Sequence, residues 1–375
     1  MEVPVTTDIS SLGAGVKAAL KTAPTSRIYF LDNLRILLAI LVVLDHAAQP
    51  YGPGGAWVIP SEPGSPLDYL ILLMFLITVP SFFMGLFFMV SAYFVPSSLE
   101  RKGAVKFLKD RLVKLGVPIL IFMIGVFPAL GYLVEGQPVI TFGHLWFLAL
   151  LLIFSTIYVA YRHAKKPSPQ VKKAFPGNAV ILAFIVAMAL GTFIVGIWFP
   201  INQWVPFGLF EPYHLTQYAM LFAAGIVAYR EGWMDAIPKA TAKLWSSIAV
   251  ILVILLLFVV ILNNGDLPMG GLSLGALFGS FWVAFMCVSA CIALLAFFNN
   301  RLNAPRPITK TLASNTFTVY LIQLPIVILL QYLLIGINID TLAKFVIVGA
   351  LGVLLSFALS HFVIRRLPYA KYILG

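Results

Sequence analysis

The chain has 375 residues, of which 61% are hydrophobic and only 10% are charged. A water-soluble domain carries about a quarter charged residues, so this composition excludes an ordinary soluble protein and indicates a lipid environment. The net charge of +11 is compatible with a nucleic-acid ligand, but membrane topology explains the basic residues better. We therefore expect an all-α, polytopic membrane protein with no nucleic-acid partner.

The two ends of the chain are predicted to be short tails around one transmembrane domain, residues 28–366. Residues 1–27 are polar and lack the compact apolar core and small-residue cleavage site of a signal peptide. We expect them to form a mostly disordered cytoplasmic tail with a short surface helix near residues 14–20. Residues 367–375 are expected to form a C-terminal cytoplasmic tail.

Ten stretches of about 20 apolar residues are each long enough to cross the hydrocarbon core as a helix. Their ranges are 33–51, 68–95, 113–134, 144–161, 178–198, 213–230, 244–263, 272–298, 314–336 and 341–364. About ten transmembrane helices place both termini on the same side of the membrane.

The distribution of basic residues predicts which side that is. With the termini inside, all but two of the 25 Lys and Arg residues fall in inner segments, where positive charge is enriched. The exceptions are Arg35, inside the first span, and Lys344, at an outer edge. The termini are therefore predicted to be cytoplasmic. An interfacial aromatic belt explains the outer tryptophans, which are Trp57, Trp146, Trp198 and Trp204.

Arg35 and His46 lie within the first span, where ionisable groups are costly and indicate function. At ~100° per residue, their spacing of eleven positions places both on one helix face, about 16 Å apart along the axis. Arg35 then lies toward the cytoplasm and His46 toward the outer leaflet. Snorkelling explains Arg35 equally well when it is taken alone, but the shared face favours a joint function. A neutral His46 can take a proton from an alcohol near neutral pH.

Several other polar residues are expected near the outer end of this helix. Asp45 lies ~100° around the helix from His46, so we expect it to contact a neighbouring helix or the acceptor rather than to orient the imidazole. No two histidines share a metal-ligand spacing such as HxxxH, so no metal is expected. A polar, water-accessible outer site is favoured instead. The residues expected to line it are Asp45, His144, Trp146, Glu211 and His214.

On the inner side, Arg111 and Lys114 lie one helical turn apart at the mouth of the third span. The positive-inside rule explains such residues, but a basic mouth below Arg35 also suits an anionic cytosolic ligand that carries phosphates. The sequence contains no Gly-rich phosphate loop, Walker motif, Rossmann fingerprint or GxSxG elbow. Nucleotide hydrolysis and nicotinamide chemistry are therefore not supported.

Five segments, taken in order, resemble the acyltransferase-3 family of integral membrane acyltransferases. RIYFLDNLRILLAILVVLDHAAQPYG is similar to the opening of the family, with its Arg-x10-His pattern, and FFMGLFFMVSAYFVPSSLERKG to its second helix. FLKDRLVKLGVP resembles an inner Arg-x-x-Arg element, GHLWFLALLLIFS the HLWFL signature, and SNTFTVYLIQLPIVI a late-helix element. The opening and the HLWFL phrase look like the branch of glucan biosynthesis protein C, which succinylates periplasmic glucans.

The resemblance implies a protein of the bacterial inner membrane with an acyl-CoA donor on the cytoplasmic side. The implied acceptor is a carbohydrate hydroxyl at or beyond the outer leaflet. The resemblance also implies that His46 is catalytic and that Arg35 is its essential companion. By the same route Arg111 and Lys114 become donor-binding candidates, and His144 a residue that lines the site.

Two positions depart from the family pattern. Lys114 stands where a second arginine is usual, which keeps the charge but loses the fork that binds phosphate with two hydrogen bonds. Gln323 stands where a histidine is usual. It keeps hydrogen bonding and can line the site, but it cannot shuttle a proton at neutral pH, so we assign it no acid–base role.

The leading hypothesis is an O-acyltransferase that moves an acetyl or succinyl group from acyl-CoA, as co-substrate, to a glycan, with no tightly bound cofactor. In it, His46 either activates the acceptor hydroxyl or takes the acyl group transiently. A transporter or flippase that uses the same intramembrane Arg and His for an anionic or lipid-linked substrate is the alternative. The third hypothesis is a structural or sensory membrane component that uses the outer His and Glu residues as a pH switch.

Overall fold

The structure is a computed structural model. It describes residues 28–53, 57–62, 64–165, 170–234, 236–263, 265, 270–368 and 370. The predicted N-terminal tail with its surface helix, and most of the predicted C-terminal tail, lie outside these residues.

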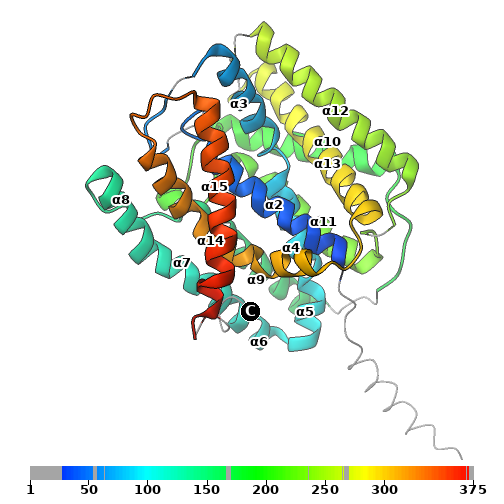
Figure 1. The fold of residues 1–375 in the computed structure, drawn as a ribbon. Helices are drawn as coiled ribbons and strands as arrows, with labels where there is room; N and C mark the ends of the chain where they lie inside the picture. Colours follow the sequence, from blue (N-terminus) through cyan, green and yellow to red (C-terminus); the bar gives the residue numbers. More distant parts are fainter. Residues whose placement is uncertain are drawn as a thin grey trace, which may run out of the picture.

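The described residues form helices and loops with no β-strand, which confirms the predicted all-α class. Figure 1 shows α2 in the middle of the bundle, where it packs against α4, α13, α14 and α15. The α-helices are α2 (Tyr29–Ala48), α3 (Pro66–Thr78), α4 (Phe83–Tyr93), α5 (Val95–Lys102), α6 (Ala104–Arg111), α7 (Val117–Ile121), α8 (Phe127–Glu135), α9 (Trp146–Ala164), α10 (Asn178–Trp198), α11 (Leu215–Glu231), α12 (Lys239–Leu262), α13 (Leu274–Arg301), α14 (Pro307–Leu333) and α15 (Thr341–Phe362).

Eight helical stretches of the described residues are long and apolar enough to cross a membrane, so the chain is a multi-pass membrane protein. They are Pro66–Lys102, Ala104–Glu135, Gly143–Ala164, Asn178–Trp198, Lys239–Leu262, Leu274–Arg301, Pro307–Leu333 and Thr341–Arg366. Each coincides with one of the predicted spans.

The other two predicted spans correspond to α2 and α11. Helix α2 is long enough to cross, but it carries three charged residues, Asp32, Arg35 and Asp45. Helix α11 has only 17 residues. Both pack among the apolar helices, α2 against α14 and α11 against α4. The count of ten spans therefore stays a prediction, because length and composition alone do not show whether α2 and α11 cross the membrane.

The third span contains two short π-helical segments, Leu112–Gly116 and Phe122–Val126. A proline follows each of them, at positions 118 and 128. Proline has no N–H for the regular helical ladder, and the wider π turns accommodate this interruption. Such bulges redirect side chains and often lie at functional sites. Lys114 lies in the first of them.

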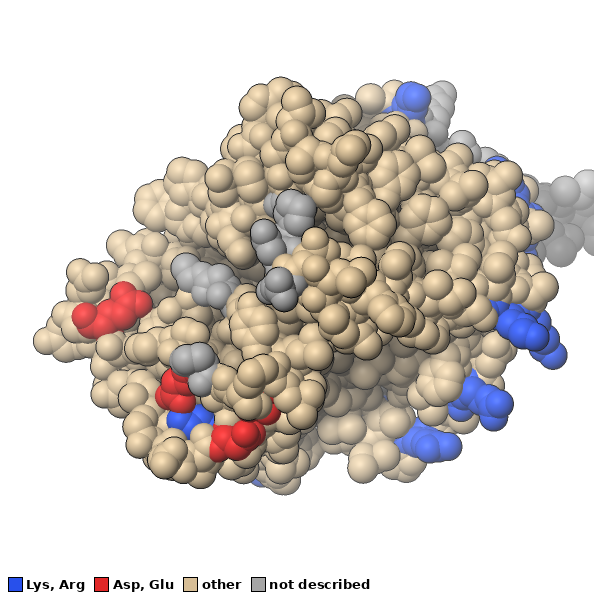
Figure 2. Space-filling model, turned by 90° about the horizontal axis from the view of Figure 1, so that it is seen from above, with Lys and Arg blue, Asp and Glu red and all other residues tan. Residues whose placement is uncertain are grey.

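Hydrogen bonds show which helix ends meet at the two ends of the bundle. At one end, Asn33 Nδ2 donates to Leu302 O at 2.6 Å, which ties the start of α2 to the turn between α13 and α14. At the other end, Lys344 at the start of α15 forms an ion pair with Glu62. Figure 2 views that second end: acidic side chains gather on one part, and most of the basic side chains in view lie at the rim.

This arrangement predicts which loops a membrane-impermeant thiol reagent reaches. Gln137 and Lys106 are exposed, whereas the native Cys287 and Cys291 are buried and should not compete. In intact cells with a permeable outer membrane, an impermeant maleimide should label Gln137→Cys at once but Lys106→Cys only after lysis. Labelling in the reverse order would contradict cytoplasmic termini.

Candidate active site

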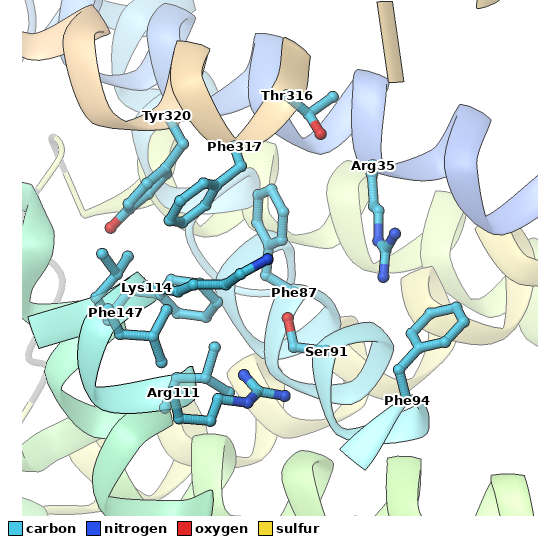
Figure 3. Close-up of a pocket in the computed structure, with 13 residues that line it drawn as sticks. Arg35, Phe87, Ser91, Phe94, Arg111, Lys114, Phe147, Thr316, Phe317 and Tyr320 are labelled. Atoms are coloured by element: carbon cyan, nitrogen blue, oxygen red, sulfur yellow. The ribbon is translucent and has the colours of Figure 1, made fainter. Parts of the chain in front are cut away.

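A cavity of about 320 Å³ is enclosed by α2, α4, α9, α14 and the start of the third span. Three cationic side chains line it: Arg35, Arg111 and Lys114. Figure 3 shows the Lys114 amine and the Arg111 guanidinium pointing toward its centre, with the Ser91 hydroxyl beside them. Sequence alone predicted that the three cations lie at one mouth, and the structure places all three around this one space.

Arg35 is held by two contacts at the rim of this cavity. Its Nη1 lies 3.4 Å from Asp32 Oδ1, and its guanidinium carbon lies 4.5 Å from the centre of the Phe94 ring. The cation–π contact offsets part of the cost of placing a charge in an apolar region. Across the cavity, Arg111 repels Arg35 electrostatically, so the unliganded cavity favours an anion.

Aromatic side chains separate this cationic cavity from the histidines beyond it. Phe147 and Tyr320 line the cavity, and their ring centres lie 5.7 Å apart. On its far side the Tyr320 ring lies 5.3 Å from the His144 ring, and the Tyr320 hydroxyl donates to the backbone oxygen of His144. Tyr320 therefore contacts both the cationic cavity and the histidine site.

His144 is oriented by a carbonyl that a proline leaves free. Pro325 lies inside α14, and because it has no N–H it cannot bond the carbonyl of Leu321, four residues earlier. That oxygen instead lies 3.0 Å from His144 Nε2. A carbonyl oxygen only accepts hydrogen bonds, so Nε2 carries the proton and Nδ1 of the neutral ring carries a lone pair.

His46 is oriented by Gln323, one turn from Tyr320 on the same helix. His46 Nδ1 lies 3.0 Å from Gln323 Oε1, so Nδ1 donates and Nε2 is left with the lone pair of a base. The His46 and His144 rings meet edge to face at 6.2 Å. Asp45 does not orient His46, in agreement with the expectation from helix geometry.

The end of α2 that carries His46 is held by Gln331 and Trp57. Gln331 Nε2 donates to the His46 backbone oxygen at 2.9 Å, which is one of the carbonyls that a helix end leaves without a partner. Gln331 Oε1 accepts from Trp57 Nε1 at 2.9 Å. Trp57 was expected in the interfacial belt, but its ring stacks on the His46 ring, with centres 5.7 Å apart.

Three polar atoms near these histidines are buried and have no hydrogen-bond partner among the described residues: His144 Nδ1, Gln323 Nε2 and Asp45 Oδ1. His144 and Gln323 are only 4% and 0% exposed. Buried polar atoms without partners are costly. These three atoms are therefore candidate contacts for a polar ligand.

The remaining predicted outer residues form a second cluster. His214 stacks on Tyr218 at 5.7 Å, and Trp146 stacks on the same ring at 5.2 Å. Glu211 Oε2 lies 3.9 Å from His214 Nε2, and both Glu211 and Asp45 interact electrostatically with Tyr218.

The three histidines expected near the outer face do not form one group. His46 and His144 meet, whereas His214 belongs to the cluster around Tyr218 and is only 8% exposed. Among the described residues no group of three His, Cys, Asp or Glu side chains could hold a metal ion.

Sequence reasoning missed Tyr320, Gln331 and Trp57 as site residues. The proline in TVYLIQLPIVI could have pointed to the helical turn that contains Tyr320, because a proline inside a spanning helix frees a carbonyl for another group. Trp57 and Gln331 gave no such signal. A tryptophan in an outer loop and a glutamine near a helix end fit ordinary interfacial positions.

A comparison with known protein families identifies the class of this multi-pass membrane protein. Residues 28–361 match the family described as an acyltransferase domain, the acyltransferase-3 family, and the chain belongs to that family. This membership confirms the resemblance and the prediction that the protein is an enzyme.

Curated relatives are found in Escherichia coli. The chain is 26% identical over 195 residues to glucans biosynthesis protein C of the strains O1:K1 / APEC, O139:H28 (E24377A / ETEC) and O9:H4 (HS). The aligned region covers 46% of this chain and 49% of each relative. The chain thus spans about half the length of the curated relatives it matches.

The proline contact can be tested by restoring the helical ladder. In Pro325→Ala the new N–H competes for the Leu321 carbonyl, and His144 loses its partner. We expect acyl transfer to fall about fivefold to tenfold, because a lost hydrogen bond is worth about 1 kcal/mol. Thermal stability should not fall, because alanine is about 3 kcal/mol more favourable than proline inside a helix.

Pro307→Ala is the matched control for this substitution. Pro307 is at the first position of the same helix, where the N–H is not used. Its replacement should leave transfer unchanged. Unaltered transfer in Pro325→Ala would contradict the role of the freed carbonyl.

Proposed function

We propose that the protein is an O-acyltransferase that moves an acetyl or succinyl group from cytoplasmic acyl-CoA to a carbohydrate hydroxyl at the outer face of a bacterial inner membrane. The observation that carries the proposal is the pairing of two sites along one helix. A cationic cavity surrounds Arg35, and a histidine pair surrounds His46. These residues are about 16 Å apart along α2, and Tyr320 contacts both sites.

Acyl-CoA suits the cationic cavity by charge and by position. Its diphosphate bridge and ribose phosphate together carry several negative charges, and guanidinium groups bind phosphate with paired hydrogen bonds. Arg111 supplies such a fork, whereas Lys114 supplies a point charge. The cavity holds part of the donor only, so the nucleotide portion stays at the mouth and the acyl-pantetheine arm extends toward His46. For this arm to pass, the Phe147 and Tyr320 side chains must move apart.

The proposed chemical step uses His46 as a general base. Its Nε2 takes the proton from the acceptor hydroxyl as the hydroxyl oxygen attacks the thioester carbonyl carbon. The carbon–oxygen bond forms, the carbon–sulfur bond breaks, and the CoA thiolate takes the proton from the imidazolium. Gln323 Oε1, which faces Nδ1, stabilises that imidazolium as it forms. Atoms and charges balance without a metal or another cofactor.

The buried atoms without partners have complementary uses in this step. The lone pair on His144 Nδ1 can accept a hydrogen bond from the acceptor and so orient its hydroxyl. The free N–H of Gln323 Nε2 can donate to the thioester oxygen as negative charge develops there. Both atoms belong to residues beside His46.

A carbohydrate acceptor is supported by the groups on the outer side and by the relatives named for glucan biosynthesis. Trp57 packs beside His46, and Trp146 lies 6.1 Å from the partly exposed Trp204. Aromatic faces present apolar surface with a polar edge, which suits sugar rings. Asp45 and Glu211 add carboxylates that can accept hydrogen bonds from sugar hydroxyls.

The first test measures transfer of labelled acetyl and succinyl groups from their CoA esters to glucan oligosaccharides in proteoliposomes. His46→Gln should lower kcat about 100-fold to 10,000-fold, the range for loss of a general base. His361→Gln, an exposed histidine on α15, should not change it. Glucan movement across the bilayer without donor would instead support a flippase, and full activity of His46→Gln would exclude the proposed base.

The second test separates donor binding from catalysis. Arg111→Gln should raise the KM for acyl-CoA about tenfold or more with a smaller change in kcat, because it removes charge-assisted hydrogen bonds. Lys106→Gln removes an exposed charge from the same helix and should leave KM unchanged. Equal effects of both substitutions would indicate general attraction to a basic surface instead of a donor site.

A further inference from the structure

A second cavity, of about 230 Å³, lies beside the first turns of α2. Its α2 lining consists of Asn33, Ile36, Leu37 and Ile40. At ~100° per residue these positions lie on the face of the helix opposite Arg35. The cavity is therefore separate from the proposed donor site, and nothing in the proposed acyl transfer uses it.

The lining of this second cavity divides into an apolar groove and a cationic mouth. The groove is formed by the α2 residues with Phe298, Leu302 and Leu312, and the span from Asn33 to Ile40 makes it about 10 Å long. Arg301, at the end of α13, and Arg306, just before α14, are exposed at the mouth.

The mouth attracts an anion through its two arginines and through a helix end. Among the described residues neither Arg301 nor Arg306 forms an ion pair. The first turn of α14 has no side-chain cap, so the positive end of this 27-residue helix faces the same space. The mouth is also held in place, because Asn33 donates to the Leu302 carbonyl.

We propose that this cavity binds an anionic phospholipid, with its phosphate between Arg301 and Arg306 and one acyl chain in the groove. Basic pockets between spanning helices at the membrane surface have the chemistry for such headgroups. A soluble anion would use the arginines but leave the apolar groove uncovered. A zwitterionic lipid would fill the groove but gain less from the two charges.

The bound lipid has a structural consequence for the active site. Its phosphate contacts the turn between α13 and α14, while its chain contacts α2, the helix that carries Arg35 and His46. Figure 1 shows the start of α14 beside the start of α2. The lipid therefore adds to the contacts that hold the start of α2 in place.

The test is a titration of the purified full chain, in a neutral detergent, followed by native mass spectrometry. Wild type should bind phosphatidylglycerol more tightly than phosphatidylcholine and should not bind glycerol phosphate at matched concentration. The double variant Arg301→Gln, Arg306→Gln should bind phosphatidylglycerol about 25-fold more weakly, since each arginine near a membrane surface contributes roughly fivefold.

Two further variants exclude trivial explanations. Lys239→Gln with Lys243→Gln also removes two exposed charges, from the start of α12, which does not line the cavity. This variant should bind phosphatidylglycerol as wild type does. Leu312→Trp fills the groove without changing the charge and should weaken binding of phosphatidylglycerol. Equal losses in both charge variants, or equal binding of the two lipids by wild type, would overturn the proposal. Tight binding of glycerol phosphate would make it a soluble-anion site and overturn it as well.

Discussion

The arrangement of the histidine site depends on the carbonyl that Pro325 leaves free in α14. Because the proline has no N–H, the Leu321 oxygen accepts from His144 Nε2, and this fixes which nitrogen of His144 carries a lone pair. Tyr320 and Gln323, on either side of Leu321, then reach the His144 backbone and the His46 ring. A single turn of α14 thus orients two histidines, His144 through the freed carbonyl and His46 through the Gln323 side chain.

The second constraint is the cost of polar groups in an apolar bundle. α2 is central and carries three charged residues, and each is held differently. Arg35 has Asp32 and the Phe94 ring, whereas one oxygen of Asp45 has no partner among the described residues. A buried polar atom without a partner costs free energy, so this oxygen is a candidate contact for a polar ligand. The apolar residues of α2 therefore stabilise the bundle, and its polar residues form the candidate site.

The fold was largely predictable from sequence because span length and charge asymmetry are local properties of the chain. The range 178–198 of α10 was predicted to the residue, since turn and loop residues flank it on both sides. The π turns before the two prolines of the third span were not predicted. Helix propensity indicates that a proline interrupts a helix, but it does not distinguish a kink from a π bulge. In the site, spacing alone placed Arg35 and His46 on one face of α2. The hydrogen bonds of His46 were not predicted, since Gln323, expected only to line the site, and Gln331 meet it through tertiary packing.

The aromatic layer between the two sites follows from the same physics. If water filled the path from the cationic cavity to His46, a reactive thioester would be open to hydrolysis and ions could cross the bundle. Phe147 and Tyr320 close that path with rings that can rotate but do not ionise near neutral pH. A flexible donor arm passes such a layer more easily than a hydrated sugar does. Under the proposed mechanism, the acyl group alone would pass this layer and the acceptor would meet it on the His46 side.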